Sequence, residues 1–375
     1  MRVLMTGGGT GGHVYPALAI AEIIKMNDPG SEIAFVGTKK GIENKLVPPH
    51  GYRLYHVEIQ GIVRSLSPKN IKTAYLILTS PGKAKKVIEE FKPDLIIGTG
   101  GYVCWPLLKA AKSMGVPCMV HESNATPGLA VKQAQKFVDV ILTSFKETED
   151  KLSAKEKVVN VGNPIRLKYE LADKAEARRK LGIPESTKLT VLSFGGSNGA
   201  EGINNAALSL MKDFSSKHED AYHIHASGTR YYDDFKKAFS KEGLDASENI
   251  MLCDYIHDMP TYMAAADVVI CRAGAMTLAE LAAIGKPAIL IPSPNVTDNH
   301  QYKNAKVIEE GGGAILAEEN ENTCDTVAEA MEKFYTDAEL CRRMGENMKR
   351  FARPDAGKNI YIEIKKLLDT RSKIV

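Results

Sequence analysis

The chain has 375 residues, of which 44% are hydrophobic and 25% charged, and its formal net charge is only +3. This composition is ordinary for a globular protein, and the small net charge excludes a polycation that would bind nucleic acid through its overall charge. A chain longer than about 250–300 residues outgrows a single hydrophobic core, so two domains are expected.

The cysteines and the apolar stretches favour a cytoplasmic protein. The six cysteines form no C-x-x-C pair and mostly lie in apolar stretches, which is typical of reduced, buried thiols. The N-terminus, MRVLMTGGGTGG, leads directly into a strand and a glycine loop, unlike a signal peptide. No stretch approaches the roughly 20 apolar residues of a membrane-spanning helix. Any membrane contact is therefore expected to be peripheral.

Short apolar strands alternate with helical patterns through the first half of the chain. A strand is predicted over Arg2–Thr6, followed by glycines and by a helix over about Tyr15–Lys25. Further strands are predicted at Glu32–Val36, Asp94–Ile97, Pro117–His121, Val138–Thr143 and Val158–Val161. This alternation favours a parallel, doubly wound sheet.

The motif Gly162-Asn163-Pro164 interrupts the alternation, and a charged helix is predicted after it at Ala172–Leu181. We therefore expect an N-terminal domain of residues 1–163 and a C-terminal domain of residues 164–349. New strands are predicted at Leu189–Phe194, His223–Ala226, Ile250–Cys253, Val268–Cys271 and Ala288–Ile291. The last 40 or so residues have a helical pattern.

The two halves share one plan at their first strands. VLMTGGGTGGHVYPALAIA begins at Val3, and VLSFGGSNGAEGINNAALS begins at Val191. Each combines a buried strand, a glycine loop and a helix rich in Ala and Leu. The fold class predicted from this repeat is α/β, with two Rossmann-like parallel-sheet domains that face each other across a cleft.

The first glycine loop, GGGTGGH from Gly7 to His13, fits the spacing G-x-G-x-x-G. A dinucleotide site also needs a carboxylate at the end of the second strand, but that strand ends Val36-Gly37-Thr38-Lys39. A nicotinamide or flavin cofactor is therefore disfavoured, and no cofactor is predicted. Exposed backbone amides at a helix N-terminus remain suited to an anion or to a closely approaching substrate.

His13 lies where the first helix begins. The positive end of the helix dipole disfavours an imidazolium, so a neutral imidazole that can act as a general base is expected. The alternative is a histidine that merely makes a structural hydrogen bond at the helix end. We favour the base because the glycine loop leaves its backbone open to a ligand.

Other loops at predicted strand ends carry polar residues on the same edge. In the first half they are Gly98-Thr99-Gly100-Gly101-Tyr102 and His121-Glu122-Ser123-Asn124, which we interpret as lining the cleft. In the second half Ser197, in GGSNGA, can offer a hydroxyl and an amide to a phosphate. Ala275-Met276-Thr277 begin another helix suited to a diphosphate, and Glu280, one to two turns further on, can hold a ribose. Asp298-Asn299-His300-Gln301 suit sugar hydroxyls.

Two further features argue against a metal. His223 and His225 share one face of a predicted strand, but no third ligand is evident. No Asp-x-Asp motif occurs, so we expect helix dipoles, amides and arginine to meet the charge of a leaving group.

Together, GGGTGGHVYPALA, GTGGYV, HESNATPG, VGNPIR, GGSNGA, CRAGAMTLAE and DNHQ resemble, in order and at comparable spacing, the motifs of the MurG family. The resemblance covers essentially the whole chain. It implies the GT-B fold, with the C-terminal helix of about residues 350–375 packed back on the N-terminal domain. It implies an inverting, metal-independent transfer of N-acetylglucosamine from UDP-GlcNAc to the 4-hydroxyl of the muramoyl unit of lipid I, giving lipid II for peptidoglycan.

The same resemblance assigns roles to individual residues. It makes His13 the favoured base and places the acceptor lipid on the N-terminal domain and UDP-GlcNAc on the C-terminal one. Residues implied to contact substrates are Thr10, Gly11, Gly12, Asn124, Arg166, Ser197, Ile256, Ala275, Met276, Thr277, Glu280, His300 and Gln301. Some family members have Gln-Gln where this chain has His300-Gln301, so the role of His300 follows less directly.

Two alternatives of other classes remain: a UDP-GlcNAc 2-epimerase of GT-B type, and a non-catalytic nucleotide-sugar sensor. UDP release without an acceptor lipid would favour the first, and binding without turnover the second.

The stretch Leu66–Lys86 suggests a membrane-binding face. Ile71, Tyr75, Leu76, Leu78 and Thr79 lie at roughly helical spacing, and Lys69, Lys72, Lys83, Lys85 and Lys86 flank them. An apolar helix face rimmed by lysines suits an anionic leaflet, although a core helix with solvated lysines has the same pattern. Because lipid I is membrane-bound, we expect a peripheral protein on the cytoplasmic face of the cell membrane.

Overall fold

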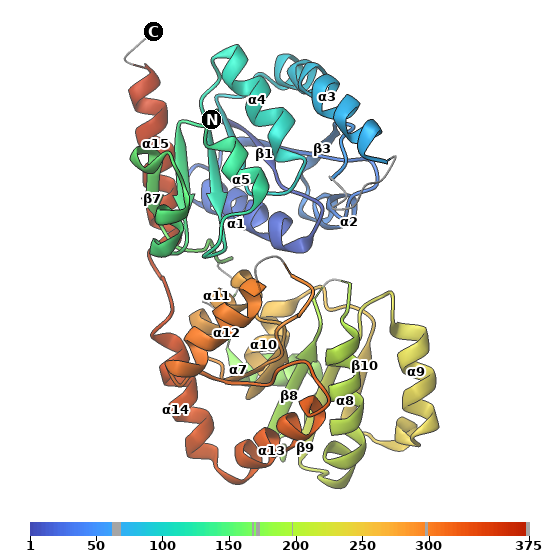
Figure 1. The fold of residues 1–375 in the computed structure, drawn as a ribbon. Helices are drawn as coiled ribbons and strands as arrows, with labels where there is room; N and C mark the ends of the chain where they lie inside the picture. The colour runs from blue at the N-terminus through green and yellow to red at the C-terminus, as the bar shows by residue number, and fades with distance from the viewer. Residues whose placement is uncertain (62–68, 167–168, 170–172, 197, 297–298, 373–375) are drawn as a thin grey trace. The chain divides into compact units, whose positions relative to one another are not determined.

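The computed structural model describes the chain except for residues 62–68, 167–168, 170–172, 197, 297–298 and 373–375, and the side chains of residues 69, 70, 72 and 372. It consists of two compact units, Met1–Arg166 with Arg353–Val375, and Leu167–Ala352 (Figure 1). Ser197, Asp298 and most of Leu66–Lys69 from the sequence analysis lie outside the described residues.

The first unit is a parallel sheet of seven strands in the order β3-β2-β1-β4-β5-β6-β7. Its strands are β1 (Arg2–Thr6), β2 (Glu32–Gly37), β3 (Arg53–His56), β4 (Leu95–Gly98), β5 (Cys118–Glu122), β6 (Val140–Thr143) and β7 (Val158–Asn160). Its helices are α1 (Gly11–Asn27), α2 (Glu43–Leu46), α3 (Lys69–Phe91), α4 (Cys104–Met114), α5 (Leu129–Ala134) and α15 (Ala356–Ser372).

Alternate residues of each strand bury against two separate helical layers. Leu4 and Ile96 join a core formed with α3, α4 and α5, whereas Val3, Met5 and Ile97 join a core formed with α1 and α15. Because side chains alternate between the two faces of a strand, a run of consecutive apolar residues is what a sheet covered on both faces requires.

The C-terminal helix α15 completes the second of these layers. Ile360, Ile364 and Leu367 pack with α1 in the core of the first unit. Gly162 has a φ of +93°, and a Cβ there would lie 2.9 Å from Cβ of Arg353. A glycine after β7 therefore lets the chain pass close to the segment that leads into α15.

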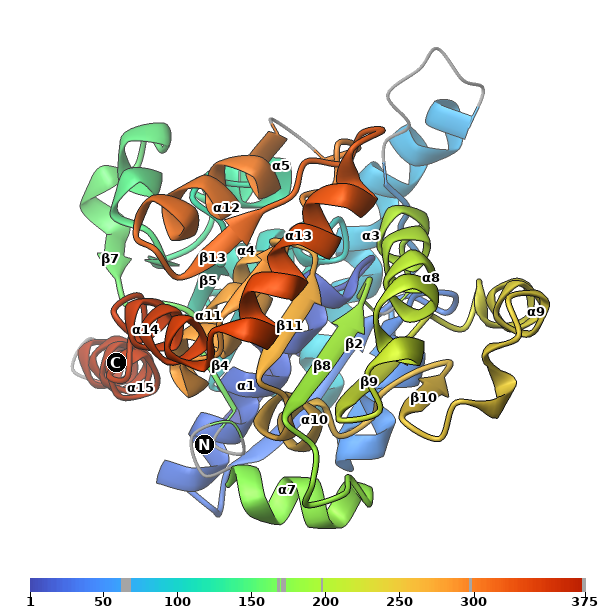
Figure 2. The same ribbon diagram turned by 90° about the horizontal axis from the view of Figure 1, so that it is seen from below.

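The second unit is a parallel sheet of six strands in the order β10-β9-β8-β11-β12-β13 (Figure 2). Its strands are β8 (Leu189–Phe194), β9 (Ala221–Ala226), β10 (Ile250–Cys253), β11 (Val268–Cys271), β12 (Ala288–Leu290) and β13 (Ala314–Leu316). Its helices are α7 (Lys174–Leu181), α8 (Glu201–Asp213), α9 (Tyr232–Lys241), α10 (Met259–Ala265), α11 (Ala275–Ile284), α12 (His300–Glu310), α13 (Thr323–Thr336) and α14 (Ala338–Lys349).

The α/β fold of two parallel-sheet domains is confirmed, and three local predictions are corrected. β3 and β13 are absent from the prediction because β3 (RLYH) is short and polar at both ends and β13 has only three residues. α1 begins at Gly11 rather than near Tyr15, so Pro16 lies inside the helix. The glycines concealed this start because they are poor helix formers.

The predicted apolar face of α3 is divided between two sides of the helix. Ile71, Tyr75 and Leu78 are 77%, 64% and 80% exposed, whereas Leu76 is 3% exposed and packs with Ile59 and Val103. Each helical residue turns by about 100°, so Leu76 cannot share the face of its neighbour Tyr75. Among the described residues, no helix is long and apolar enough to cross a membrane.

Candidate functional site

The strand order of each sheet reverses direction at one point, where loops of adjacent strands face each other. In the first unit this point lies between β1 and β4, and in the second between β8 and β11. Open parallel sheets bind ligands at the carboxyl ends of the strands at such switch points. The glycine loops identified in the sequence lie at these two switch points. Each unit therefore has one candidate site, at the carboxyl edge of its own sheet.

In the first unit, the loops after β1 and β4 are tied together. The Gly8 N–H donates to the Gly100 carbonyl at 3.4 Å, and the Thr99 hydroxyl donates to the His13 carbonyl at 2.6 Å. Gly101 has a φ of +82°, and a Cβ there would overlap the Gly8 carbonyl oxygen. The close approach of the two loops therefore requires glycine at this position.

His13 is the third residue of α1, and its ring is held by the glycine loop. Nδ1 lies 3.1 Å from the Gly8 carbonyl oxygen and 3.2 Å from the Thr10 hydroxyl. A carbonyl oxygen can only accept a hydrogen bond, so Nδ1 carries the proton and Nε2 of the neutral ring has a free lone pair.

The surroundings of His13 keep this ring neutral. Burial lowers the pKa of His13 below its ordinary value, and this effect outweighs the opposing hydrogen bond to the Gly8 carbonyl. A Cβ at Gly100, whose φ is +107°, would lie 3.0 Å from Nε2. Glycine at this position thus leaves room for the ring, and the arrangement can accept a proton from a bound hydroxyl.

Asn124 is positioned by the buried carboxylate of Glu122, which was predicted to line the cleft rather than to hold a neighbouring side chain. Oε1 of Glu122 accepts hydrogen bonds from the backbone N–H and the side-chain amide of Asn124, at 2.9 and 3.1 Å. Oε2 accepts from the Gly128 N–H at 2.8 Å. The amide oxygen of Asn124 therefore has its orientation set from within the protein, as a residue that contacts a substrate requires.

His121 does not line a cleft as predicted, because it belongs to β5 and is fully buried. Nε2 lies 3.0 Å from the Gly162 carbonyl oxygen, and burial lowers the pKa of His121 to about 4. The strand ends at Glu122, one residue beyond its predicted end, and the His121 side chain lies among core contacts.

In the second unit, two helices begin at the switch point. Ala200 and Gly274, the N-cap residues of α8 and α11, have extended backbone and make no side-chain cap. Ala275 and Met276 are 5% and 8% exposed in the first turn of α11. The positive end of a helix dipole at such a switch point suits the oxygens of a diphosphate.

The remaining predicted residues of this unit lie at or near the same edge. Glu280 is partly buried in the second turn of α11, and Ile256 is buried just after β10. The Gln301 side chain accepts a hydrogen bond from the Ser293 N–H at 2.9 Å, which anchors the loop between β12 and α12. Arg272, which follows β11, pairs with Glu319 and donates to the Ile291 carbonyl at 3.0 Å.

The predicted residues thus divide between the units. The first unit contains Thr10, Gly11, Gly12, His13, Asn124 and Arg166, and the second contains Ile256, Ala275, Met276, Thr277, Glu280, His300 and Gln301.

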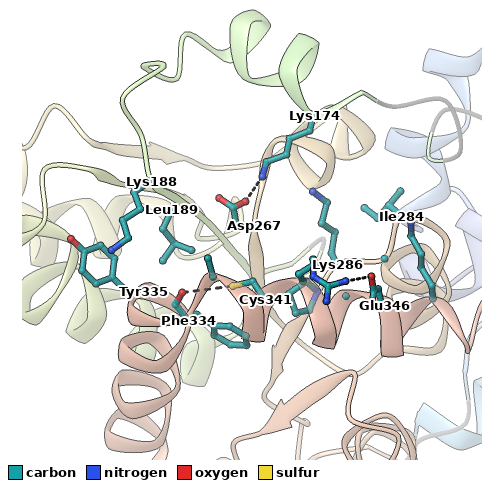
Figure 3. Close-up of a pocket in the computed structure, with 16 residues that line it drawn as sticks. Lys174, Lys188, Leu189, Asp267, Ile284, Lys286, Phe334, Tyr335, Cys341 and Glu346 are labelled. Carbon is teal, nitrogen blue, oxygen red and sulfur yellow. Dashed lines mark hydrogen bonds and ion pairs between the residues drawn. The ribbon is translucent and has the colours of Figure 1, made fainter.

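A cavity of about 520 Å³ in the second unit lies at the opposite edge of the sheet, near the start of β8 and β12 (Figure 3). It contains none of the predicted site residues. Its basic side chains are largely engaged: Lys174 pairs with Asp267, Lys188 lies over the Tyr335 ring, and Lys286 donates to two backbone carbonyls. The cavity is therefore not assigned to the substrate.

His223 and His225 form part of the core rather than a metal site. Both rings lie 2.8 Å from the Ser193 hydroxyl, and burial lowers the pKa of each to about 3. Within the part of the chain that the structure describes, no cluster of three or more His, Cys, Asp or Glu residues could hold a metal ion.

Two Rossmann-like sheets with glycine loops at their switch points define the GT-B fold class. The model of the glycosyltransferase family 28 N-terminal domain matches residues 3–143, and that of the C-terminal domain matches residues 190–360. The chain belongs to this family and, within it, to the MurG family of N-acetylglucosamine transferases.

Individual relatives support this assignment along the whole chain. A UDP-N-acetylglucosamine–N-acetylmuramyl-(pentapeptide) pyrophosphoryl-undecaprenol N-acetylglucosamine transferase from Acetivibrio thermocellus is 42% identical, over 99% of this chain and 100% of the relative. The enzyme of that name from Clostridioides difficile is 40% identical, over 100% of this chain and 90% of the relative. The crystal structure of Acinetobacter baumannii MurG, 27% identical, matches with a TM-score of 0.70 over 97% of this chain and 99% of that one.

A UDP-GlcNAc 2-epimerase from Neisseria meningitidis also has this fold. Its structure matches with a TM-score of 0.68 over 98% of this chain and 100% of that one, at 16% identity. At this identity the likeness concerns the fold alone, and the transferase reading is supported over the epimerase alternative.

Proposed function

We propose that the protein transfers N-acetylglucosamine from UDP-GlcNAc to the 4-hydroxyl of the muramoyl unit of lipid I, and so produces lipid II for peptidoglycan synthesis. The observation that carries this proposal is the full-length identity of about 40% to transferases named for this donor and this acceptor. The glycine loops at both switch points supply the anion-binding and base-holding features that such a transfer requires.

In the proposed mechanism, His13 acts in a single, inverting displacement. Nε2 accepts the proton of the 4-hydroxyl as its oxygen bonds to the anomeric carbon of N-acetylglucosamine. The bond from that carbon to the diphosphate breaks, and the electron pair leaves with UDP. The position of Nε2, with Nδ1 bound to the Gly8 carbonyl, supports this role. Thr10, Gly11 and Gly12 would line the acceptor edge beside it.

The donor would be held mainly by residues of the second unit. The first turn of α11 at Ala275–Thr277 would bind the diphosphate at the positive end of the helix dipole. Glu280 would bind the ribose, Ile256 the uracil and Gln301 the sugar. Asn124, Arg166, Ser197 and His300 are further proposed donor contacts, and Ser197 lies outside the described residues.

We further propose that the chemistry needs no divalent metal, because helix N-termini can stabilise the departing diphosphate. The test for both proposals is transfer of label from UDP-GlcNAc to a lipid I analogue, with and without EDTA. We expect full transfer in EDTA. Loss of transfer that only added metal restores would contradict metal independence, and UDP release without any acceptor would contradict the transferase assignment.

We also propose that the first unit binds the cytoplasmic face of the membrane through α3. Ile71, Tyr75 and Leu78 form an exposed stripe, defined here as the α3 stripe, at the spacing i, i+4, i+7. Lys85 and Lys86 follow on the same helix, and Lys83 pairs with Glu58 at 2.8 Å. An apolar stripe with nearby lysines matches an anionic lipid surface, where a lipid-linked acceptor is found.

A further inference from the structure

Glu43 is a buried carboxylate close to the loop that holds His13. It lies in α2 with only 1% of its surface exposed. Oε1 accepts hydrogen bonds from the Thr38 N–H at 2.6 Å and the Thr38 hydroxyl at 2.9 Å. Oε2 is buried without a hydrogen-bonding partner among the described residues. A buried carboxylate oxygen left unpaired is costly, so its retention calls for a functional reason.

Three glycines leave room for this carboxylate. A Cβ at Gly8 would lie 3.0 Å from Oε2 of Glu43, and a Cβ at Gly37 or Gly41 would overlap the Glu43 side chain. By contrast, a Cβ at Gly82 would meet nothing within 4 Å. Gly8, Gly37 and Gly41 therefore surround the carboxylate from the β1 loop, the end of β2 and the turn that precedes α2.

Gly8 connects this carboxylate to the proposed base. Its carbonyl oxygen accepts the hydrogen bond from Nδ1 of His13, and Oε2 of Glu43 lies against the same residue. The charge of Glu43 also reaches the neighbouring Cys104, where it adds to the effect of burial that raises the pKa of the thiol to about 11. Gly8 is therefore the residue through which the carboxylate and the His13 ring are linked.

We propose that Glu43 is a positioning residue for His13, which fixes Gly8 and stabilises the imidazolium that forms during transfer. This inference rests on the proposed function. When Nε2 accepts the acceptor proton, the ring gains a positive charge while Nδ1–H stays bonded to the Gly8 carbonyl. A negative charge on Glu43 would make the protonated ring more favourable and so make His13 a stronger base.

The test is the pH dependence of kcat for the full-length protein with a soluble lipid I analogue. A nearby carboxylate raises the pKa of a histidine. Glu43→Gln should therefore move the acidic limb of the curve of kcat against pH, where kcat falls as His13 is protonated, to lower pH by about one unit. The weaker base should lower kcat on the plateau by about tenfold, since base strength governs proton transfer. The KM for UDP-GlcNAc should stay unchanged, and Glu43→Asp, which keeps the charge, should leave the limb near its wild-type position.

A second variant tests the same idea without changing residue 43. Gly41→Ala places a methyl group where the carboxylate lies and should displace it, with the same shift of the acidic limb. Gly82→Ala and Glu90→Gln are matched controls, because position 82 is open and Glu90 is an exposed partner of Arg53. In both controls, the acidic limb of the kcat profile should stay at its wild-type pH.

Two outcomes separate this inference from the proposed function. An unshifted limb in both Glu43→Gln and Gly41→Ala, with lowered thermal stability, would overturn the positioning role and leave the transferase intact. Undiminished turnover of His13→Ala would instead overturn the assignment of the base on which this role depends.

Discussion

At the scale of single residues, His13 combines a fixed tautomer with an accessible lone pair. His13→Ala should lower transfer by about 10²–10⁴-fold, the usual contribution of a general base. Binding of UDP-GlcNAc, measured by calorimetry, should stay nearly intact, because the proposed diphosphate contacts lie in the second unit. Turnover within a few-fold of wild type would reduce His13 to a structural hydrogen bond at the helix start.

Glu280 offers a second test at this scale. Loss of a buried, charge-assisted hydrogen bond costs about 1.5–3 kcal/mol, so Glu280→Ala should weaken UDP and UDP-GlcNAc by roughly ten- to a hundred-fold. Titration of each nucleotide measures the effect. Glu332→Ala, an exposed carboxylate on α13 of the same unit, is the matched control and should bind normally. If UDP affinity is the same in both variants, Glu280 does not contact the ribose.

At the scale of an element, the α3 stripe predicts where the protein meets lipid. Replacing Ile71, Tyr75 and Leu78 by serine should reduce sedimentation with anionic vesicles, because the exposed apolar area is lost. Changing Lys83, Lys85 and Lys86 to glutamate, together with Lys69 and Lys72, should have the same effect. Each basic residue near such a surface contributes about 1 kcal/mol, and high salt should weaken the binding as well.

The control for the stripe is Val307→Ser, which removes an exposed apolar residue of α12 in the second unit. Turnover of a short-chain, water-soluble acceptor should change little in all of these variants. Equal vesicle binding before and after the α3 substitutions would show that another surface contacts the membrane.

At the scale of the whole molecule, buried histidines predict acid sensitivity in both units. Burial lowers the pKa of His121 to about 4 and of His223 and His225 to about 3, against an ordinary value of 6.5. A lowered pKa in the folded state means that unfolded chains bind protons first as the pH falls. The contribution of these residues to stability is therefore complete above about pH 6.5 and declines below it.

Urea unfolding between pH 7.5 and 4.5 measures this decline. The free energy of unfolding should fall from about pH 6.5 downward, before most carboxylates take up protons. His121→Gln should flatten the decline in the first unit, because glutamine cannot be protonated in this range. A free energy that stays constant between pH 6.5 and 5 would contradict the prediction.

Much of the fold was predictable because its causes are local. Consecutive apolar residues such as Val3, Leu4 and Met5 face helices on both sides of the sheet, so the strands were visible as short apolar runs. The glycine loop before His13 and the helix start at Ala275 could also be predicted, because each is marked by residues that are adjacent in the sequence. The short strand β3 was not, since an edge strand with polar ends has little apolar signal.

Side chains that meet only in three dimensions could not be predicted in this way. The sequence by itself determined the α/β class, the two-sheet plan and the family, because these depend on local periodicity and ordered motifs. Only the tertiary structure showed that Glu43 reaches Gly8, that Glu122 orients Asn124 and that Leu76 leaves the stripe of Tyr75. Such contacts depend on the order of the strands and the rotation of the helices. These bring together residues whose separation in the sequence follows no regular period.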